Sequence, residues 1–299
     1  MTIEQQRGGE KLEREEKQRP NAVLPVTPVS ELQGRPFPKT AACLVIGDEI
    51  LNGKVADTNS GFFVKFCFNH GIVVKRIEVV PDEEGTIIEA VRRLSSNYDF
   101  VVTSGGIGPT HDDITYPSIA RAYGLPLKCH QPTLDRMNGV TKGVPLMQSD
   151  SRKRMALFPE PSLVVFPSES LWVPIVIVNE NVHILPGIPV LFRGMLSGYG
   201  KYLREGEKFV TRYVKTFKQE SLIAPVLAST QKKVESLGIK IGSYPKWTEN
   251  KRLVVVSLLS RETNRDVVTE LAKEVAAEVD GVLIDKLDDD EEGDVVKPV

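Results

Sequence analysis

The residues best suited to bind a ligand or to catalyse a reaction lie between positions 100 and 115, where an apolar run leads into a glycine-rich turn. The turn contains Gly105, Gly106 and Gly108, and glycines let backbone N–H groups close on a phosphate. A helical pattern follows the turn at once, and the amino terminus of a helix adds partial positive charge. We therefore predict that residues 105–113 bind a phosphate group.

Two adjacent carboxylates, Asp112 and Asp113, end this turn. Beside a phosphate they would repel an anionic ligand unless a cation lay between the protein and the ligand. A divalent ion such as Mg²⁺ meets this need, because it bridges carboxylate and phosphate oxygens. In the structural alternative, one aspartate caps the following helix and the other is solvated. Capping leaves the glycines unexplained, so we favour a metal site.

Further turns are expected to meet this one. Asp48 and Glu49 follow the first predicted strand, residues 57–59 (Asp-Thr-Asn) cap the next predicted helix, and Gly187 follows a late strand. In an open parallel sheet, ligands bind outside the carboxyl ends of the strands. We therefore expect these turns at one edge of the sheet, although Asp48 has the alternative role of an acid at a helix start.

The elements that must position these turns alternate between short β-branched runs and helical patterns. Strands are predicted at residues 41–46, 72–80, 100–103 and 182–185, and helices at residues 60–69, 83–95, 114–123 and from residue 190. This alternation is typical of a mostly parallel sheet covered by helices on both faces. Residues 131–174 are rich in proline, and for them we predict short helices and an extended excursion.

A second pattern begins near residue 208. Its order of strands and helices, βαββαβ, predicts a smaller ferredoxin-like α+β domain. The domains predicted are a disordered tail at residues 1–39, a catalytic domain at 40–205, the βαββαβ domain at 206–285 and an acidic tail at 286–299. We assign the smaller domain a structural or dimerising role and expect a homo-oligomer.

Composition excludes several classes of function. The 38 Lys and Arg residues nearly balance the 40 Asp and Glu residues, so no excess of positive charge favours nucleic acid or an anionic membrane surface. No apolar run reaches the roughly 20 residues that a membrane helix needs. The three cysteines are scattered, which fits a reducing compartment. We expect a soluble cytoplasmic protein with a small-molecule ligand.

Four motifs occur in a fixed order: residues 47–53 (GDEILNG), 57–59 (DTN), 105–115 (GGIGPTHDDIT) and 185–189 (LPGIP). Together they resemble the MoaB/Mog fold family, a three-layer α/β fold with a mostly parallel sheet. The pairing of the first turn with GPTxDD is similar to one branch of that family. This branch includes the stand-alone fungal FAD pyrophosphatase and the amino-terminal domains of CinA and animal FAD synthase. The resemblance covers roughly residues 40–200, and the βαββαβ unit also occurs in the branch.

The resemblance implies a metal-dependent pyrophosphatase that hydrolyses FAD to FMN and AMP, with ADP-ribose as a further substrate. It implies that the substrate is held by Gly105, Gly106, Gly108, Thr110, Asn59 and Gly187. It also implies a divalent ion of the Mg, Co or Ni class on Asp113, Asp112 and Asp48, with Asp113 and Asp112 as the catalytic pair. Arg154 would neutralise charge on the leaving phosphate, and its alternative is a solvated place on a surface helix.

Two other functions stay open. In the Mog branch, an aspartate at the position of Asp113 assists transfer of AMP to molybdopterin, and a basic residue commonly precedes it. This chain has Asp112 there, which favours the pyrophosphatase over a molybdopterin adenylyltransferase. The remaining alternative is a non-catalytic scaffold that binds a nucleotide or a pterin.

Overall fold

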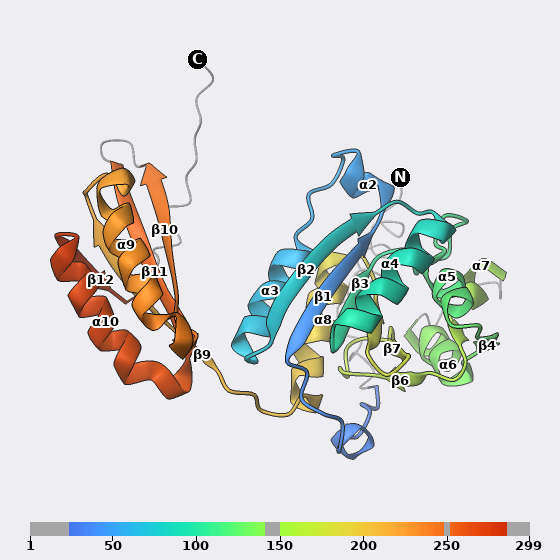
Figure 1. Ribbon diagram of the computed structural model, residues 1–299. Helices are drawn as coiled ribbons and strands as arrows, with labels where there is room; N and C mark the ends of the chain where they lie inside the picture. The colour runs from blue at the N-terminus through green and yellow to red at the C-terminus, as the bar shows by residue number, and fades with distance from the viewer. Residues whose placement is uncertain (1–23, 141–149, 248–251, 286–299) are drawn as a thin grey trace, which may run out of the picture. The chain divides into compact units, whose positions relative to one another are not determined.

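The computed structural model describes residues 24–140, 150–247 and 252–285. The chain forms two compact units, one from Met1–Cys67 with Ile72–Arg204 and the other from Phe68–Gly71 with Glu205–Val299 (Figure 1). All the candidate site residues belong to the first unit.

The first unit is built on a six-stranded sheet in the order β2-β1-β3-β8-β7-β6. Its strands are β1 (Thr40–Ile46), β2 (Val73–Val80), β3 (Phe100–Ser104), β6 (Leu163–Val165), β7 (Ile175–Val178) and β8 (Val182–Leu185). Strands β2, β1, β3 and β8 run parallel, whereas β7 is antiparallel to both of its neighbours. The predicted mostly parallel sheet is confirmed.

Helices cover both faces of this sheet (Figure 1). Helices α3 (Asn59–Asn69) and α8 (Pro189–Tyr199) pack on one face, and α4 (Glu84–Asn97) and α5 (Thr115–Ala122) pack on the other. Strand β1 is apolar throughout because it supplies both layers: Cys43 enters the first and Leu44 the second. The predicted three-layer α/β fold is therefore confirmed.

The order of the strands creates a switch point between β1 and β3. Helix α3 connects β1 to β2 across one face, and α4 connects β2 to β3 across the opposite face. In open α/β sheets, ligands bind in the crevice at such a point, outside the carboxyl ends of the strands. The turn that follows β3 opens at this crevice.

The remaining elements of the first unit are short. They are η1 (Val29–Leu32), α2 (Asp48–Leu51), β4 (Leu127–Cys129), α6 (Gln131–Val140), α7 (Asp150–Arg154), β5 (Leu157–Pro159) and η2 (Gly200–Tyr202). Strands β4 and β5 pair with each other in a separate antiparallel ribbon. The proline-rich segment thus contains the short helices that the sequence predicted, α6 and α7.

Residues 24–39 belong to the first unit and not to a tail. Leu32 is 3% exposed and packs in the core between the sheet, α3 and α8. The Phe166 amide donates to Thr27 Oγ1 at 2.9 Å, and the Tyr202 hydroxyl donates to the Thr27 carbonyl at 2.6 Å. The prediction of a disordered tail is therefore wrong for residues 24–39, whose few irregular contacts leave no periodic pattern. Residues 1–23 and the predicted acidic tail, 286–299, lie outside the described residues.

The second unit has the order that the sequence predicted. Its elements are β9 (Phe209–Thr216), α9 (Glu220–Val234), η3 (Glu235–Leu237), β10 (Lys240–Trp247), β11 (Arg252–Arg261), η4 (Glu262–Asn264), α10 (Arg265–Glu278) and β12 (Gly281–Ile284). The sheet order is β10-β11-β9-β12 with every pair antiparallel, and α9 and α10 bury its apolar side. This arrangement confirms the smaller ferredoxin-like domain.

Candidate functional site

The turns after β1, β2, β3 and β8 meet at one edge of the sheet. Hydrogen bonds continue past the last strand residues: the Gly47 amide donates to the Val80 carbonyl at 3.1 Å, and the Gly105 amide donates to the Leu185 carbonyl at 3.2 Å. Strands β1, β3 and β8 also end in register, because Ser104 pairs with both Val45 and Leu185. The turns that carry Asp48, Gly105 and Gly187 are therefore side by side.

Gly105 lies at the closest approach between these turns. Its φ is +115°, and a Cβ there would lie 2.1 Å from the carbonyl oxygen of Ile46. On the other side, a Cβ on Gly187 would lie 3.2 Å from the Gly105 Cα. Three backbones thus pack against one another with no room for a side chain, which explains the glycines at both positions.

Asp113 closes the loop that the glycine-rich turn begins. Its Oδ1 accepts a hydrogen bond from the Gly108 amide at 2.6 Å, and its Oδ2 accepts from the Thr110 amide at 2.9 Å and from the Thr110 hydroxyl at 2.5 Å. The residue that precedes α5 is Ile114, and no side chain caps this helix. The Asp113 carboxylate therefore holds residues 108–113 in place, a role that the sequence did not predict.

These bonds decide which amides of the turn stay available. Gly105 and Gly108 donate within the protein, whereas the amides of Gly106 and Ile107 have no acceptor among the described residues. The turn is fixed from α5, because Thr115 Oγ1 donates to the Gly105 carbonyl and the Thr115 amide to the Gly106 carbonyl, both at 2.9 Å. Of the glycines predicted to donate to a phosphate, only Gly106 keeps a free N–H, and Ile107 joins it.

Asp82, in the turn after β2, is a site residue that the sequence reasoning missed. Its Oδ2 accepts a hydrogen bond from the Asp48 amide at 3.0 Å. Partial burial raises the pKa of Asp82, and the negative charges of Asp48, Glu49 and Asp112 raise it further, against the lowering effect of the Asp48 amide. Four carboxylates from three turns therefore share this edge. A lone aspartate two residues after a strand gives little local signal, so the sequence pattern does not predict it.

Asp112 lies on the solvent side of this group, with 63% of its side chain exposed. The polar Thr110 side chain beside it lowers its pKa, and the charges of His111 and Arg154 lower it further. Arg154, at the end of α7, is thus close enough to act on Asp112 through its charge.

Asn59 links the end of β3 to the turn after β8. Its Nδ2 donates to Ser104 Oγ at 3.0 Å and to the Gly187 carbonyl at 2.7 Å. Asp57 holds the start of α3, because its Oδ1 accepts from the Asn59 amide at 2.9 Å and from the Ser60 amide at 3.0 Å. The predicted capping by this segment is confirmed, and Asn59 and Gly187 lie together as predicted.

The predicted metal ligands do not form a preformed cage. In the part of the chain that the structure describes, no three His, Cys, Asp or Glu side chains are grouped so that they could hold a metal ion alone. The donors at this edge are carboxylate oxygens, which suit Mg²⁺ and similar hard ions. Such ions commonly use one or two carboxylates and complete their coordination with substrate phosphates. The donor set therefore fits an ion that binds together with a phosphate ligand.

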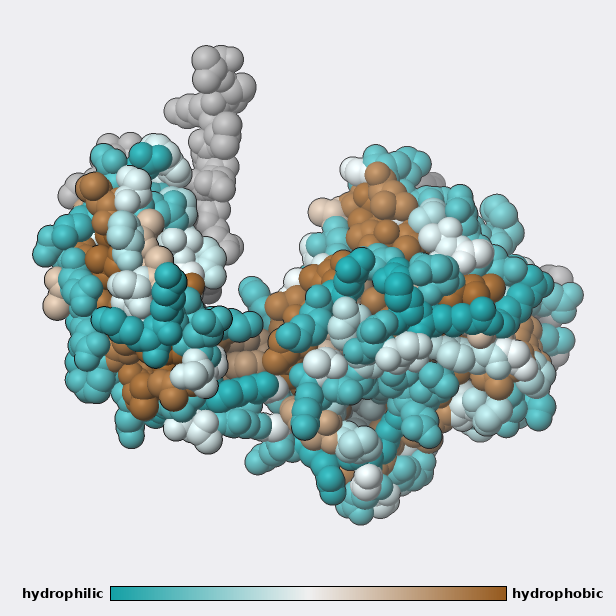
Figure 2. Space-filling view, viewed as in Figure 1, coloured by the Kyte–Doolittle hydropathy of each residue, from teal (hydrophilic) through white to brown (hydrophobic). Residues whose placement is uncertain are grey.

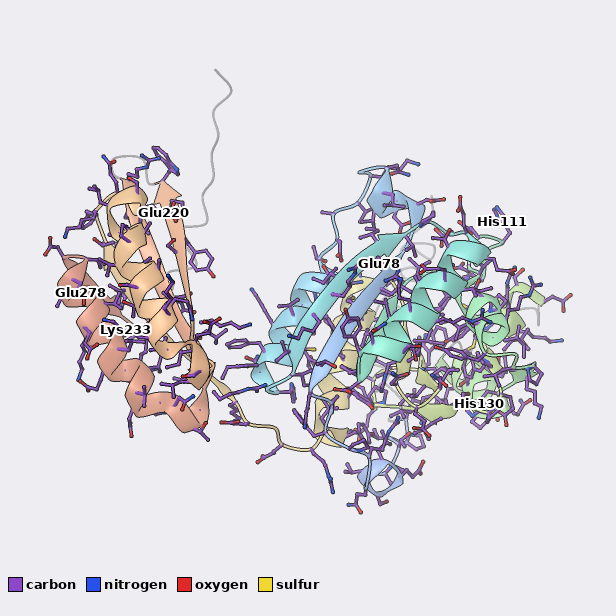
Figure 3. The ribbon with its side chains drawn as sticks, viewed as in Figure 1. Glu78, His111, His130, Glu220, Lys233 and Glu278 are labelled. Atoms are coloured by element: carbon purple, nitrogen blue, oxygen red, sulfur yellow. The ribbon has the colours of Figure 1, made fainter. Side chains whose placement is uncertain are left out.

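Other reactive side chains take no part in the site. His111 projects from the loop into solvent with 98% of its side chain exposed, and His130 lies on the far side of α5, near α6 (Figure 3). Burial raises the pKa of the Cys43 and Cys67 thiols, so neither is a thiolate nucleophile. No helix within the described ranges has the length and apolarity needed to span a bilayer.

Comparison with known proteins agrees with this architecture. Residues 42–205 match the family described as a probable molybdopterin binding domain, and residues 208–286 match the middle domain of FAD synthase. The first match spans more than half of the chain, so the chain belongs to the molybdopterin-binding domain family. The family resemblance seen in the motifs is confirmed.

Several known proteins are similar to this chain in sequence. A probable FAD synthase of Caenorhabditis elegans is 31% identical in an alignment of 269 positions that covers 82% of this chain and 51% of that protein. A protein of Pyrococcus horikoshii is 33% identical in an alignment of 218 positions that covers 69% of this chain and 84% of that protein. A CinA-like protein of Myxococcus xanthus is 35% identical over 158 residues, 52% of this chain and 37% of the relative. The chain spans about half the length of the Caenorhabditis relative.

Two solved structures are similar to part of this chain. CinA from Thermoplasma acidophilum is 32% identical with a TM-score of 0.47, over 55% of this chain and 96% of that chain. MoaB from Thermus thermophilus is 20% identical with a TM-score of 0.35, over 55% of this chain and 89% of that chain.

Proposed function

We propose that this protein is a metal-dependent pyrophosphatase that hydrolyses FAD to FMN and AMP. The observation that carries the proposal is one arrangement: two free backbone amides, Gly106 and Ile107, open at the switch point beside the carboxylates of Asp48, Asp82 and Asp112. Amides alone would suit any anion. The carboxylates beside them favour an anion that arrives with a cation, as a pyrophosphate does.

Support for FAD as the dinucleotide comes from the relatives. The second unit matches the middle domain of FAD synthase, and two nematode relatives are named probable FAD synthases. The adenylyl and flavin halves of FAD are joined by a pyrophosphate, the group for which the glycine-rich turn is suited. ADP-ribose shares this linkage and is a further candidate substrate.

The chain's own residues would bind and orient the pyrophosphate. The amides of Gly106 and Ile107 donate to its oxygens, and the start of α5 adds partial positive charge behind them. Arg154 offsets the charge that builds up on the departing phosphate. Asp113 acts as a positioning residue, because it fixes the loop that presents Thr110 and Asp112.

Asp48, Asp82 and Asp112 would hold a divalent ion together with the pyrophosphate oxygens. When bound, this ion neutralises phosphate charge and polarises a phosphoryl group toward attack. In the reaction, the oxygen of a water molecule bonds to one phosphorus, and the bond from that phosphorus to the bridging oxygen breaks. The bridging oxygen leaves with the electron pair on the other mononucleotide, and the proton of the water passes to solvent.

Product analysis tests the proposal. The protein is incubated with FAD, with ADP-ribose, or with ATP plus molybdopterin, each with EDTA or with Mg²⁺, Co²⁺ or Ni²⁺, and the products are separated by chromatography. We expect FMN and AMP in equal amounts, only when a divalent ion is present. Adenylated molybdopterin with intact FAD would assign the protein to adenylyl transfer. Binding of a nucleotide without any cleavage would indicate that the protein is a non-catalytic scaffold.

A pair of variants links that activity to the site. Asp112→Asn removes one carboxylate from the edge, and Asp135→Asn removes an exposed carboxylate from α6, where Asp135 contacts Gln131. Removal of one preorganised electrostatic contact commonly lowers the rate by about 10²–10³-fold. We expect this loss for Asp112→Asn and an unchanged rate for Asp135→Asn. Equal rates for the two variants would contradict the site.

A further inference from the structure

Asn59 has a carbonyl oxygen that nothing in the described structure uses. The residue is 5% exposed, and its Oδ1 is buried with no hydrogen-bond partner among the described residues. A buried acceptor without a donor is costly, at roughly 1–3 kcal/mol. Such an atom has hydrogen-bonding capacity that a water molecule or a ligand group can complete.

The orientation of this amide is fixed by its other end. Both protons of Nδ2 are donated, one to Ser104 Oγ and one to the Gly187 carbonyl. A flipped amide would place Oδ1 against the Gly187 carbonyl, and two acceptors would face each other. The orphan atom is thus an acceptor, and it calls for a ligand that carries an O–H or N–H donor.

Asn59 lines a small pocket. Its floor and walls come from β1, the segment that precedes α3, and the turn after β8, and include Val55, Ala56, Asn59, Ser104 and Pro189. The pocket volume is about 60 Å³. Pockets that enclose a whole drug-sized ligand are about 300–1,000 Å³, so this pocket is too small for a flavin or adenine ring and suits a small hydroxylated group.

Exposed apolar side chains lie near the pocket, whose lining also includes Glu49 and Asp57. Val55 in the lining is 51% exposed, Leu51 and Ile188 adjoin lining residues in the chain and are 54% and 60% exposed, and hydrophobic side chains gather over α2 in Figure 2. The carboxylates of the site lie at the other end of α2, where Asp48 begins the helix. A ligand at this edge therefore meets carboxylates on one side and apolar side chains on the other.

The position of the pocket selects which part of a nucleotide enters it. Ser104, which contacts Asn59, directly precedes the turn that holds the free amides of Gly106 and Ile107. In a dinucleotide, the groups attached next to the phosphates are sugar carbons with hydroxyls, and the rings come later. We propose that this pocket is a sugar subsite in which Asn59 Oδ1 accepts a hydrogen bond from a hydroxyl of the nucleotide. The inference rests on the proposed function and adds to it a preference for hydroxylated sugars.

Binding of the two products and their deoxy analogues tests the subsite without hydrolysis. By calorimetry we compare AMP with 2′-deoxy-AMP and 3′-deoxy-AMP, and FMN with a flavin phosphate whose linker lacks the ribityl hydroxyls. Loss of the hydroxyl that Asn59 accepts leaves the buried oxygen unpaired, so we expect about tenfold weaker binding in one of these pairs. The pair that responds identifies ribose or ribityl as the source. Equal binding within every pair would overturn the subsite.

Variants assign the effect to Asn59. In Asn59→Ala, the discrimination between the hydroxylated ligand and its deoxy analogue should disappear, whatever happens to overall affinity. A second variant covers the case in which this protein fails to fold: Ala56→Trp places a bulky side chain on the pocket from an exposed position. It should weaken the hydroxylated mononucleotide at least tenfold while leaving inorganic pyrophosphate unaffected. Lys54→Trp, exposed and outside the pocket, is the matched control.

The outcomes separate the two proposals. If Asn59 discriminates between the ligands but FAD is never cleaved, the sugar subsite stands and the pyrophosphatase is wrong. If FAD is cleaved and no deoxy analogue binds more weakly, the subsite is wrong and the pyrophosphatase stands. Unchanged nucleotide binding in Ala56→Trp also contradicts the subsite.

Discussion

The backbone amide of Asp48 donates to the carboxylate of Asp82 at 3.0 Å, which ties the turn after β1 to the turn after β2. The same contact brings two acidic side chains together, and burial and like charges hold the pKa of Asp82 above its usual value. In the free protein this edge is therefore electrostatically strained. A bound cation would relieve that strain.

Asp82→Asn tests this balance between stability and function. The amide oxygen still accepts from Asp48, while the charge is removed, so we expect a higher Tm at pH 7 and a large loss of metal-dependent turnover. Because the folded-state pKa of Asp82 is raised, its charge costs stability as pH rises through that pKa. The gain in Tm should therefore vanish below about pH 3.8 and grow above it. A variant that is less stable than the wild type at neutral pH would contradict this account.

Asp99 should show the opposite dependence of stability on pH in the same experiment. Its Oδ2 accepts from the amides of Lys39 and Thr40, and these bonds lower its pKa despite partial burial. A lowered pKa means that its contribution is present above the unfolded value and is lost as pH falls through the folded pKa. Asp99→Asn should therefore lower Tm at pH 7, and its effect should shrink in acid. Thermal unfolding across pH measures both variants together.

Gly105→Ala should destabilise the first unit strongly. The added Cβ would meet the Ile46 carbonyl at 2.1 Å, at a φ of +115° that side chains rarely adopt. Backbone must move, and we expect a loss of about 3 kcal/mol or more, which is in the range of severe mutations. Gly85→Ala, near the start of α4 with open space around it, is the control and should change stability by at most about 1 kcal/mol, in the stabilising direction. Chemical denaturation measures both free energies of unfolding.

Asp113→Asn should loosen the loop at residues 108–113. An amide offers one oxygen in place of two, so either the Gly108 or the Thr110 N–H loses its acceptor. Hydrogen bonds to a charged group contribute about 1.5–3 kcal/mol, and part of this should be lost from stability. Turnover should fall about 10²-fold, in kcat more than in affinity for the divalent ion, because Asp113 positions the loop. A shift confined to metal affinity would make Asp113 a ligand instead.

Leu32→Ala tests the packing of residues 24–39. Leu32 is buried in the core that also contains α3 and α8, and truncation of a buried leucine costs about 2–5 kcal/mol. Val29→Ala, in the same short helix but 42% exposed, should cost little. Urea denaturation of the two variants gives the comparison. Equal stabilities would mean that this segment contributes nothing to the fold.

The sequence was sufficient for the sheet and for the edge at which the site lies. Strand–turn–helix signals are local: an apolar run, a glycine with a required backbone shape and a helical period follow one another within residues 100–123. What a side chain contacts across turns is not local. The direction of the Asp113 carboxylate depends on how the loop folds back, and the place of Asp82 depends on β2 lying next to β1.

The orientation of the Asn59 amide depends on a part of the chain that is synthesised late. Its amide is oriented by Ser104 and by the carbonyl of Gly187, which follows β8, near the end of the first unit. A nascent chain that stops before Val182 already carries the glycine-rich turn but lacks the acceptor that orients Asn59. During synthesis, the Asn59 amide is therefore oriented only after β8 has joined β3.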